Sequence, residues 1–488
     1  MIALVRIPRR TRTDLIAISI VLTAASWLIA ALGLFGSLRE SLTILYLWQT
    51  LFLSTLIFVR SEGNPYQIFR PTTLMIIYIG INAGVGAYIF NVGALIGPPT
   101  LFVPRYNAWS NLFDVYVVVS ASMTLAFIFQ SVVDASIQSR PGSSRVSYKI
   151  QSLIFIYLLS IFSMLIVVSM VDENIVVIVA RSVIVIAIFY VAFSQNSKFR
   201  WLIVLACVSS LAVVSADSKR EAIFVLLPAV FMEMSRYRQI DMSLRLVMVG
   251  FVMITVCTAL IVAMSILRGY AGLEARGLIN ALELVPTYLM SDIALAMLGN
   301  NFEISYMFFV LHDSISVALN DHRNVLMYGE SYLKTFFVGV PEELLGFKPR
   351  SIVEGYTAHL APAFRAVGGS FPPTIIGEAF WNFGWFAFLA LIFIFFVLDG
   401  IYKRICLAVP RSSLAMICLM LFTYHMLPSL FRGPGFDLVW AYIIVAAAAC
   451  AALLLPVEFV LNILTQKSGR PVTRSVLPRR RIIQSHRS

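Results

Sequence analysis

Five arginines lie in polar segments that separate or flank long apolar stretches, where a charged side chain would meet a membrane–water boundary: Arg220, Arg268, Arg276, Arg365 and Arg432. The guanidinium group is a planar fork that stays charged and can donate two parallel hydrogen bonds to a phosphate. A cluster of such groups at one face of a membrane would suit a lipid diphosphate. The structural alternative is that each arginine extends to lipid headgroups or pairs with a nearby acid.

Glu378 is a candidate of a different kind, because it stands just inside an apolar stretch. An ionisable side chain at membrane depth is a functional hypothesis by default. The alternative is that Glu378 pairs with one of the arginines and stabilises the fold. His312, His322 and His359 could each act as a base near neutral pH, although most such residues are ordinary loop or interface histidines.

Standard catalytic signatures are absent from the sequence. There is no phosphate-binding Walker loop, no zinc-binding HExxH motif and no GxSxG nucleophile motif. No paired-acid motif occurs in a segment expected outside the cytoplasm. These absences argue against a nucleotide-driven pump and a metal-dependent hydrolase, and we predict neither a metal site nor a cofactor. The five cysteines form no CxxC pair and are interpreted as reduced core residues.

The composition places these residues in a membrane protein. Of the 488 residues, 59% are hydrophobic and 13% are charged, whereas a soluble globular protein carries roughly 25% charged residues. This composition excludes a soluble enzyme, a disordered protein and a secreted disulfide scaffold. The formal net charge of +12 would suggest nucleic acid in a soluble protein. In a membrane protein it first indicates topology, and we predict no nucleic-acid partner.

The sequence predicts an all-α, polytopic integral membrane protein with about twelve transmembrane helices, since a span needs about 20 apolar residues. The expected spans are residues 14–36, 41–59, 72–93, 110–133, 150–171, 174–194, 201–215, 221–234, 246–267, 374–400, 412–431 and 437–464. The seventh and eighth of these stretches are short, so a re-entrant pair is the alternative there.

The basic residues predict the orientation. If the amino terminus is inside, lysines and arginines collect in the cytoplasmic segments, as the positive-inside rule requires, and both termini are cytoplasmic. The expected organisation is residues 1–267 with the first nine spans, 268–373 as a long extracytoplasmic loop, 374–466 with the last three spans, and 467–488 as a basic cytoplasmic tail. Within the loop, residues 278–298 and 304–319 are typical of amphipathic helices that lie on the membrane surface. The tail is expected near anionic headgroups, so membrane lipids are partners.

Two segments, Tyr328–Pro349 (YGESYLKTFFVGVPEELLGFKP) and Gly368–Gly384 (GGSFPPTIIGEAFWNFG), carry a resemblance to a known family. The first resembles the long-loop motif of the Wzy-type oligosaccharide repeat-unit polymerases, and Gly368–Gly384 resembles the segment with which the same family enters its next span. The SKRE stretch at Arg220 and the FRG turn at Arg432 are similar to further family positions. The likeness covers about residues 215–437, and the first spans match in hydropathy alone.

One residue departs from the family pattern. The family often has an arginine after the loop proline, whereas Pro341 is followed here by Glu342. The anchoring charge is therefore lost at this position or moved to Lys348 or Arg350.

The resemblance implies a metal-independent glycosyltransferase at the outer face of the bacterial inner membrane, where it polymerises oligosaccharide repeat units carried on undecaprenyl diphosphate. The growing glycan leaves its lipid carrier and joins the sugar of an incoming lipid-linked oligosaccharide, and a chain-length regulator protein is a candidate partner. The five arginines would stabilise the departing diphosphate. The acceptor hydroxyl needs a base, for which the candidates, in falling order, are Glu378, Asp313 and His359.

Three alternatives remain open at the level of sequence. An O-antigen ligase has a related architecture and passes the glycan to lipid A core, so it differs in the acceptor. A flippase or exporter of lipid-linked sugars would place charges along a central cavity, whereas only Arg181 and Glu378 clearly fall inside spans. A metal-dependent lipid-linked glycosyltransferase is disfavoured by the missing acidic pair.

Overall fold

The computed structural model describes residues 12–92, 110–133, 148–171, 174–195, 197–214, 224–235, 277–291, 304–320, 325–408 and 413–467, with isolated positions between 237 and 294. In these residues the secondary structure is helical, with short 3₁₀ turns and no strand. Nine of the described helices are long and apolar enough to cross a membrane. The chain is an all-α, multi-pass membrane protein, as its composition predicts.

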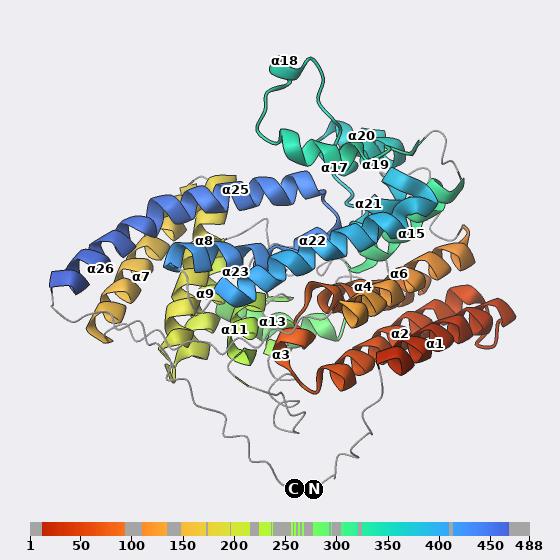
Figure 1. Ribbon diagram of the computed structural model, residues 1–488, viewed down its shortest axis with the longest axis horizontal. Coiled ribbons are helices and arrows are strands. Elements are labelled where there is room, and N and C mark those ends of the chain that lie inside the picture. The colour runs from red at the N-terminus through yellow and green to blue at the C-terminus, as the bar shows by residue number, and fades with distance from the viewer. Residues whose placement is uncertain are drawn as a thin grey trace, which may run out of the picture.

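Four long helices near the amino terminus pack side by side (Figure 1): α1 (Arg12–Leu32), α2 (Leu38–Ser61), α4 (Pro71–Asn91) and α6 (Leu112–Val132), with the short α3 (Pro65–Ile68) before α4. Gly80 and Gly84 let α2 and α4 approach closely. A Cβ atom at Gly80 would lie 1.7 Å from Thr50 Oγ1, and one at Gly84 would lie 2.8 Å from Leu47 Cγ. Small residues four positions apart are a common device for helix packing in membranes, where no hydrophobic effect drives helices together.

A second group surrounds α8 (Ile175–Ser194), which packs against α7 (Tyr148–Val171), α9 (Arg200–Val214), α11 (Leu226–Met234), α23 (Leu414–His425) and α25 (Phe436–Leu453). Residues 179–189 of α8 are all buried. Apart from Arg181 and Ser182, which are buried with it, the segment is apolar on all sides, which is typical of a helix enclosed by other helices.

Two of the predicted spans are confirmed as apolar helices but are interrupted. Residues 374–400 form α21 (Thr374–Phe383), a 3₁₀ turn η2 (Gly384–Phe386) and the first part of α22 (Ala387–Ala408). Gly384 has φ 54° and ψ −130°, a conformation open mainly to glycine. Residues 412–431 divide into α23 and α24 (Leu427–Arg432), whose first turn contains a proline. The final span consists of α25 followed by α26 (Leu455–Lys467).

The predicted count of spans is only partly tested. The nine described spanning helices match the first six and last three predicted spans. The predicted span 201–215 contains α9, which has 15 residues, and 221–234 contains α11, which has 9 residues. The predicted span 246–267 lies mostly outside the described residues. Whether the chain crosses the membrane in these three segments stays a prediction.

The helix at residues 304–320 corrects an expectation. The sequence predicts that it lies on the membrane surface, but α15 (Ile304–Asn320) packs against α4, α6 and α21, and residues 307–316 are buried without a break. Its polar residues face partners inside the bundle rather than water: His312 Nε2 pairs with Tyr46 Oη at 3.0 Å, and Asp313 Oδ2 accepts from Tyr356 Oη at 2.8 Å. The prediction of an interfacial helix is therefore wrong for α15.

The other predicted interfacial helix has one buried face. In α13 (Leu278–Leu289), Ala281, Val285 and Tyr288 are buried, whereas Ile279 is 77% exposed. The three buried side chains pack with Val262, Ala263 and Ile266. The spacing of four and three residues puts the buried side chains on one face of the helix. The amphipathic pattern is thus confirmed for residues 278–289.

Short helices between residues 325 and 373 gather at one end of the bundle: α17 (Glu330–Lys334), η1 (Thr335–Phe337), α18 (Glu342–Leu345), α19 (Ile352–Leu360) and α20 (Pro362–Ala366). α17 and η1 pack against α25, and the Met327 N–H donates to the Trp381 carbonyl of α21. We call this the Glu378 end. Because α22 runs away from it, Asp399 and its partner Arg70 lie toward the opposite end, which we call the Asp399 end.

Candidate active site

α21 carries Glu378 and is buried along its length, because residues 374–382 are all buried. Its first residue, Thr374, has φ 65°, which is rare for a β-branched side chain and implies local strain. Two contacts hold this conformation. Thr374 Oγ1 accepts from the Gly377 N–H at 3.1 Å, and a Cβ atom at Gly433 would lie 2.4 Å from Thr374 C. The start of α21 is thus fixed by close packing against the end of α24.

The Glu378 carboxyl is fully buried, and its two oxygens have different environments. Ser331 Oγ of α17 donates to Glu378 Oε1 at 2.9 Å. Asn382 Nδ2, one turn further along α21, donates to Ser331 Oγ at 2.8 Å and to the Glu378 carbonyl at 2.8 Å. Among the described residues, Glu378 Oε2 has no hydrogen-bond partner. A carboxylate oxygen left in this state can accept a hydrogen bond or a proton from a bound molecule.

Two further oxygens lie near this carboxyl. Asp437, in the first turn of α25, and the phenol of Tyr332 both interact electrostatically with Glu378. Within the described part of the chain, Asp437 Oδ1 and Tyr332 Oη also have no hydrogen-bond partner. The Tyr332 ring is stacked on Phe383, with ring centres 5.7 Å apart. Burial raises the pKa of Tyr332, and the nearby Glu378 adds to the effect, so its hydroxyl keeps its proton and can donate it in a hydrogen bond.

Cations lie on the side of the cluster away from the bundle. Lys334 Nζ is 2.7 Å from Glu354 Oε2 and 3.9 Å from Asp437 Oδ2. Arg365 Nη2, one of the five predicted diphosphate-binding arginines, is 3.5 Å from Glu354 Oε1. Partial burial would raise the pKa of Glu354, but hydrogen bonds from Lys334 and Ser351 outweigh it and the pKa is lowered. Glu354 is therefore held as an anion between two cations.

The two other candidate bases lie on helices next to α21. A Cβ atom at Gly377 would lie 2.4 Å from Ser314 Oγ, so α15, with Asp313, packs tightly against α21. The His359 ring of α19 contacts Trp381 of α21, with ring centres 5.6 Å apart at 67°. The fold therefore brings the elements that carry all three predicted bases together, but Asp313 is enclosed in the bundle and only Glu378 faces the cluster of Tyr332 and Asp437.

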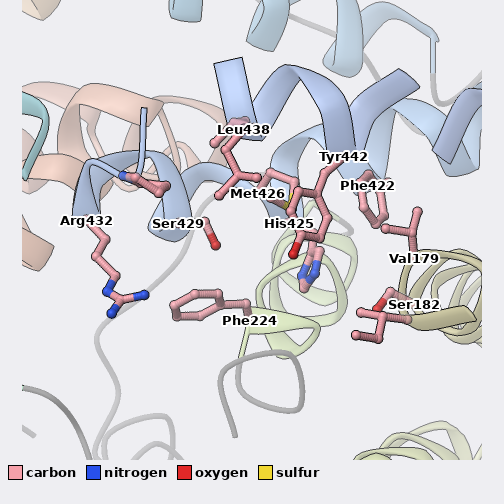
Figure 2. Close-up of a pocket in the computed structure, with 13 residues that line it drawn as sticks. Val179, Ser182, Phe224, Phe422, His425, Met426, Ser429, Arg432, Leu438 and Tyr442 are labelled. Atoms are coloured by element: carbon pink, nitrogen blue, oxygen red, sulfur yellow. The ribbon is translucent and has the colours of Figure 1, made fainter. Parts of the chain in front are cut away.

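Arg432 lies in a separate cavity of about 120 Å³. α8, α23, α24 and α25 form its walls, and its lining is mostly apolar (Figure 2). Figure 2 shows Arg432 at one end, with Ser429 and Phe224 between it and His425, and Val179 and Ser182 beyond His425. Gly433, the next residue, touches Thr374 at the start of α21. Arg432 is thus one residue from a contact with the helix that carries Glu378, although it does not belong to the Glu378 cluster.

The remaining predicted arginines, Arg220, Arg268 and Arg276, lie outside the described residues. Four residues of the cluster that the sequence did not single out are Ser331, Tyr332, Lys334 and Asp437. The first three stand inside the segment Tyr328–Pro349, whose resemblance to a family motif could have indicated them. Asp437 stands at the start of the last span, and this position at the membrane boundary could have indicated it. Among the residues that the structure describes, no group of three or more His, Cys, Asp or Glu side chains could hold a metal ion.

Comparison with known proteins identifies no relative of this chain. No family model matches it, and neither a curated protein nor a solved structure matches it. What the protein does must therefore be inferred from its own residues.

Proposed function

We propose that this protein polymerises oligosaccharide repeat units carried on undecaprenyl diphosphate, at the outer face of a bacterial inner membrane. In the proposed reaction, a hydroxyl oxygen of the incoming lipid-linked unit forms a bond to the anomeric carbon of the growing glycan. The bond from that carbon to the diphosphate breaks, and undecaprenyl diphosphate leaves with the bonding electrons. The hydroxyl proton passes to a carboxylate of the protein.

Glu378 is the proposed base, and the unpaired Oε2 is the main support for the proposal. A base must reach the hydroxyl that it deprotonates, and an oxygen that accepts no other hydrogen bond has both of its lone-pair sites available for that contact. Ser331 fixes the other oxygen at 2.9 Å, which orients the carboxyl before substrate arrives. Tyr332 would donate a hydrogen bond to the same sugar.

The cations around Glu354 are the proposed binding groups for the diphosphate. Arg365 and Lys334 both contact Glu354, and a diphosphate could replace that carboxylate as their partner. An arginine fork matches phosphate oxygens in pairs, whereas a lysine acts as a point charge. Arg432, Arg220, Arg268 and Arg276 stay further candidates from the sequence.

The sidedness in this proposal has one structural support. Arg70 and Lys403, which the positive-inside rule assigns to the cytoplasm, both contact Asp399, at the end of the bundle opposite Glu378. With this end inside, the Glu378 cluster lies at the outer face and both termini are cytoplasmic. A lipid diphosphate in the outer leaflet would then be at the depth of the cluster.

A complementation experiment in a strain that lacks this chain tests the proposal. We expect the deletion strain to lose long surface glycan and to accumulate single repeat units on the lipid carrier. Wild-type protein should restore long chains. Glu378→Gln keeps the shape of the side chain but removes the base, and should lower the polymerisation rate about 10²–10⁴-fold at normal membrane abundance. Glycan length on gels and mass spectrometry of the lipid-linked pool are the measurements.

Glu40→Gln is the matched control. Glu40 is an exposed carboxylate in the first turn of α2, and its Oε2 accepts only the local Ser37 N–H at 3.1 Å among the described contacts. Glutamine can take over this capping role, so long chains should persist. Long glycan in the deletion strain would refute the proposed function. Long chains that remain on the lipid carrier would instead indicate a ligase, and repeat units trapped at the inner face would indicate a flippase.

A further inference from the structure

Residues 335–349, which include η1 and α18, form a hairpin that projects away from the helical bundle (Figure 1). We call it the projecting hairpin. Its two ends are joined at the base: the Arg350 N–H donates to Glu330 Oε1 at 2.8 Å, and Arg350 Nη2 donates to Glu330 Oε2 at 2.9 Å. A closed base on a long excursion indicates a defined structural unit rather than a loose connection.

The hairpin presents large apolar side chains to its surroundings, from η1 at its start to the residues after α18. Phe336 is 81% exposed, Leu344 77% and Phe347 60%. The turns at Gly339 and Gly346 have positive φ, and a Cβ atom at either would meet nothing within 4 Å. Gly339 and Gly346 therefore lie where no other described part of the protein approaches the chain. Exposed apolar groups concentrated on one short segment mark an interaction surface.

The position of the hairpin indicates what covers this surface. η1 and α17 pack against α25, which is one of the spanning helices. On α25, Trp440 and Ile444 are 45% and 46% exposed, as expected for side chains that face lipid. The hairpin projects crosswise to α22 and α25 in Figure 1. A segment that extends crosswise from the end of a spanning helix stays at the level of the membrane surface.

We infer that the projecting hairpin is a membrane anchor that inserts Phe336, Leu344 and Phe347 into the lipid beside α25. Leu333 of α17, the helix that packs against α25 just before the hairpin, is also 46% exposed. Lys348 follows the tip and can place its charged end among the headgroups while its aliphatic stem remains in apolar surroundings. The anchor would hold residues 325–373 against the bilayer, and it does not depend on the proposed reaction.

Spin labels on full-length protein in vesicles of phosphatidylethanolamine and phosphatidylglycerol test the inference. Labels are attached at Phe336→Cys, Leu344→Cys and Phe347→Cys, one at a time, and collisions with oxygen and with an aqueous nickel chelate are measured. Ala358→Cys, at an exposed position of α19, is the matched control. Unsubstituted protein corrects for native cysteines, of which Cys207, Cys406, Cys418 and Cys450 are buried.

We expect the three hairpin labels to collide with oxygen several-fold more often, relative to the chelate, than the Ala358 label. Leu344→Cys should also lose nickel accessibility when the protein moves from detergent into vesicles. Nickel accessibility in vesicles equal to that at Ala358 would overturn the inference and leave a protein partner as the occupant of the surface. Glycan polymerisation is not part of the readout, so failure of the proposed function would not affect the result.

Discussion

Asp399 and Glu378 are two buried carboxylates of the same interrupted span, and they differ in how their oxygens are paired. Asp399 Oδ1 accepts from Arg70 Nη2 at 2.5 Å, and Asp399 Oδ2 is 2.8 Å from Lys403 Nζ. Glu378 Oε1 accepts from Ser331, whereas Oε2 has no partner among the described residues. One carboxylate is thus saturated by two cations, and the other retains an oxygen for a further contact.

The surroundings of Asp399 explain why saturation suits a structural role. Tyr402 Oη, on the next turn of α22, donates to the Tyr66 carbonyl at 2.9 Å, and Tyr424 Oη donates to the Phe69 carbonyl at 2.9 Å. These bonds and the Arg70–Asp399 pair join the turn before α4 to α22 and α23. Both oxygens of Asp399 and both tyrosine hydroxyls are paired in this joint, and among the described residues Arg70 Nε is its atom without a hydrogen-bond partner. Because the carboxylate is already held by two cations, the joint offers little to a ligand.

The Glu378 end has the opposite character. Its polar groups are placed by neighbours from α17 and α25 but are not fully satisfied by them, and buried polar groups without a partner are rare in folded proteins. Such exceptions concentrate at functional sites, because a site must keep bonding capacity for its substrate. The comparison therefore predicts that substitutions at Asp399 act on stability, whereas substitutions at Glu378 act on activity.

Asp399→Asn should have the largest effect on stability. The change keeps the side-chain shape but leaves Arg70 buried without its countercharge. Breaking a buried ion pair by removing one partner typically lowers stability by about 3–5 kcal/mol. We expect a clearly lower midpoint of thermal unfolding in detergent and less protein in the membrane, whereas Glu378→Gln should leave both close to wild type. Asp399→Glu, which keeps the charge, is the control.

Equal thermal midpoints for Asp399→Asn and wild type would remove the assigned difference between the two carboxylates. A large loss of stability in Glu378→Gln would also contradict the assigned difference, because Glu378 would then be a structural residue.

Ser331→Ala should have an intermediate effect, since it tests how Glu378 is positioned. The substitution removes the only donor to Glu378 Oε1 among the described residues and also one acceptor of Asn382. Leaving a buried polar group unpaired costs about 1–3 kcal/mol. We expect polymerisation of a purified lipid-linked unit to fall about tenfold, equivalent to about 1.4 kcal/mol, and the pH dependence of the rate to shift. Ser331→Thr retains the hydroxyl and should recover most of the rate.

A combination of variants separates positioning from folding. If Ser331 acts through Glu378, then adding Ser331→Ala to Glu378→Gln should lower the rate no further, because the two residues act as a unit. Full additivity of the two losses, or an unshifted pH profile in Ser331→Ala, would show that Ser331 does not orient the carboxyl.

The multi-pass fold could be predicted from the sequence because a spanning helix must cover its backbone with apolar side chains over its whole length. The interruptions within the last spans were harder to predict from the sequence. Gly384 adopts a conformation open mainly to glycine, but an isolated glycine in an apolar stretch is compatible with a continuous helix.

α15 shows where sequence reasoning fails. His312 and Asp313 interrupt an apolar segment, and hydropathy assigns such residues to a water-facing side. Their partners in the fold, Tyr46 and Tyr356, are 266 and 43 residues distant in sequence. Because a polar side chain is stable in the interior once it is hydrogen-bonded, its position cannot be deduced without knowing which long-range partner the fold supplies.

The candidate site, like α15, could be predicted only in part from the sequence. Glu378 could be identified because it is an ionisable residue in an apolar stretch. Its pairing with Ser331 and its proximity to Asp437 depend on three segments that meet only in the folded chain. The sequence therefore indicates Glu378 itself, whereas the neighbours that orient its carboxyl can be identified only from the structure.

Glu354→Gln should have the smallest effect, and the effect should depend on pH. The pKa of Glu354 is lowered in the folded protein: partial burial raises it, but the hydrogen bond from Lys334 at 2.7 Å and those from Ser351 lower it more. A lowered folded pKa means that the carboxylate contributes stability above its unfolded pKa of about 4.3 and loses that contribution as the pH falls through the folded value. Because the side chain is 39% exposed, solvent screening should keep the contribution below about 1 kcal/mol.

Thermal unfolding of wild type and Glu354→Gln across a pH series measures this contribution. At neutral pH the variant should unfold at a slightly lower temperature, and the difference should shrink to zero in acid below the folded pKa. Glu343→Gln, a change at an exposed carboxylate on α18, is the control and should follow wild type throughout. If Glu354→Gln were instead more stable at neutral pH, Glu354 would not be held by Lys334 and Arg365. A diphosphate would then reach those two cations without displacing a carboxylate, and the Glu378 end would be more open than its ion pairs indicate.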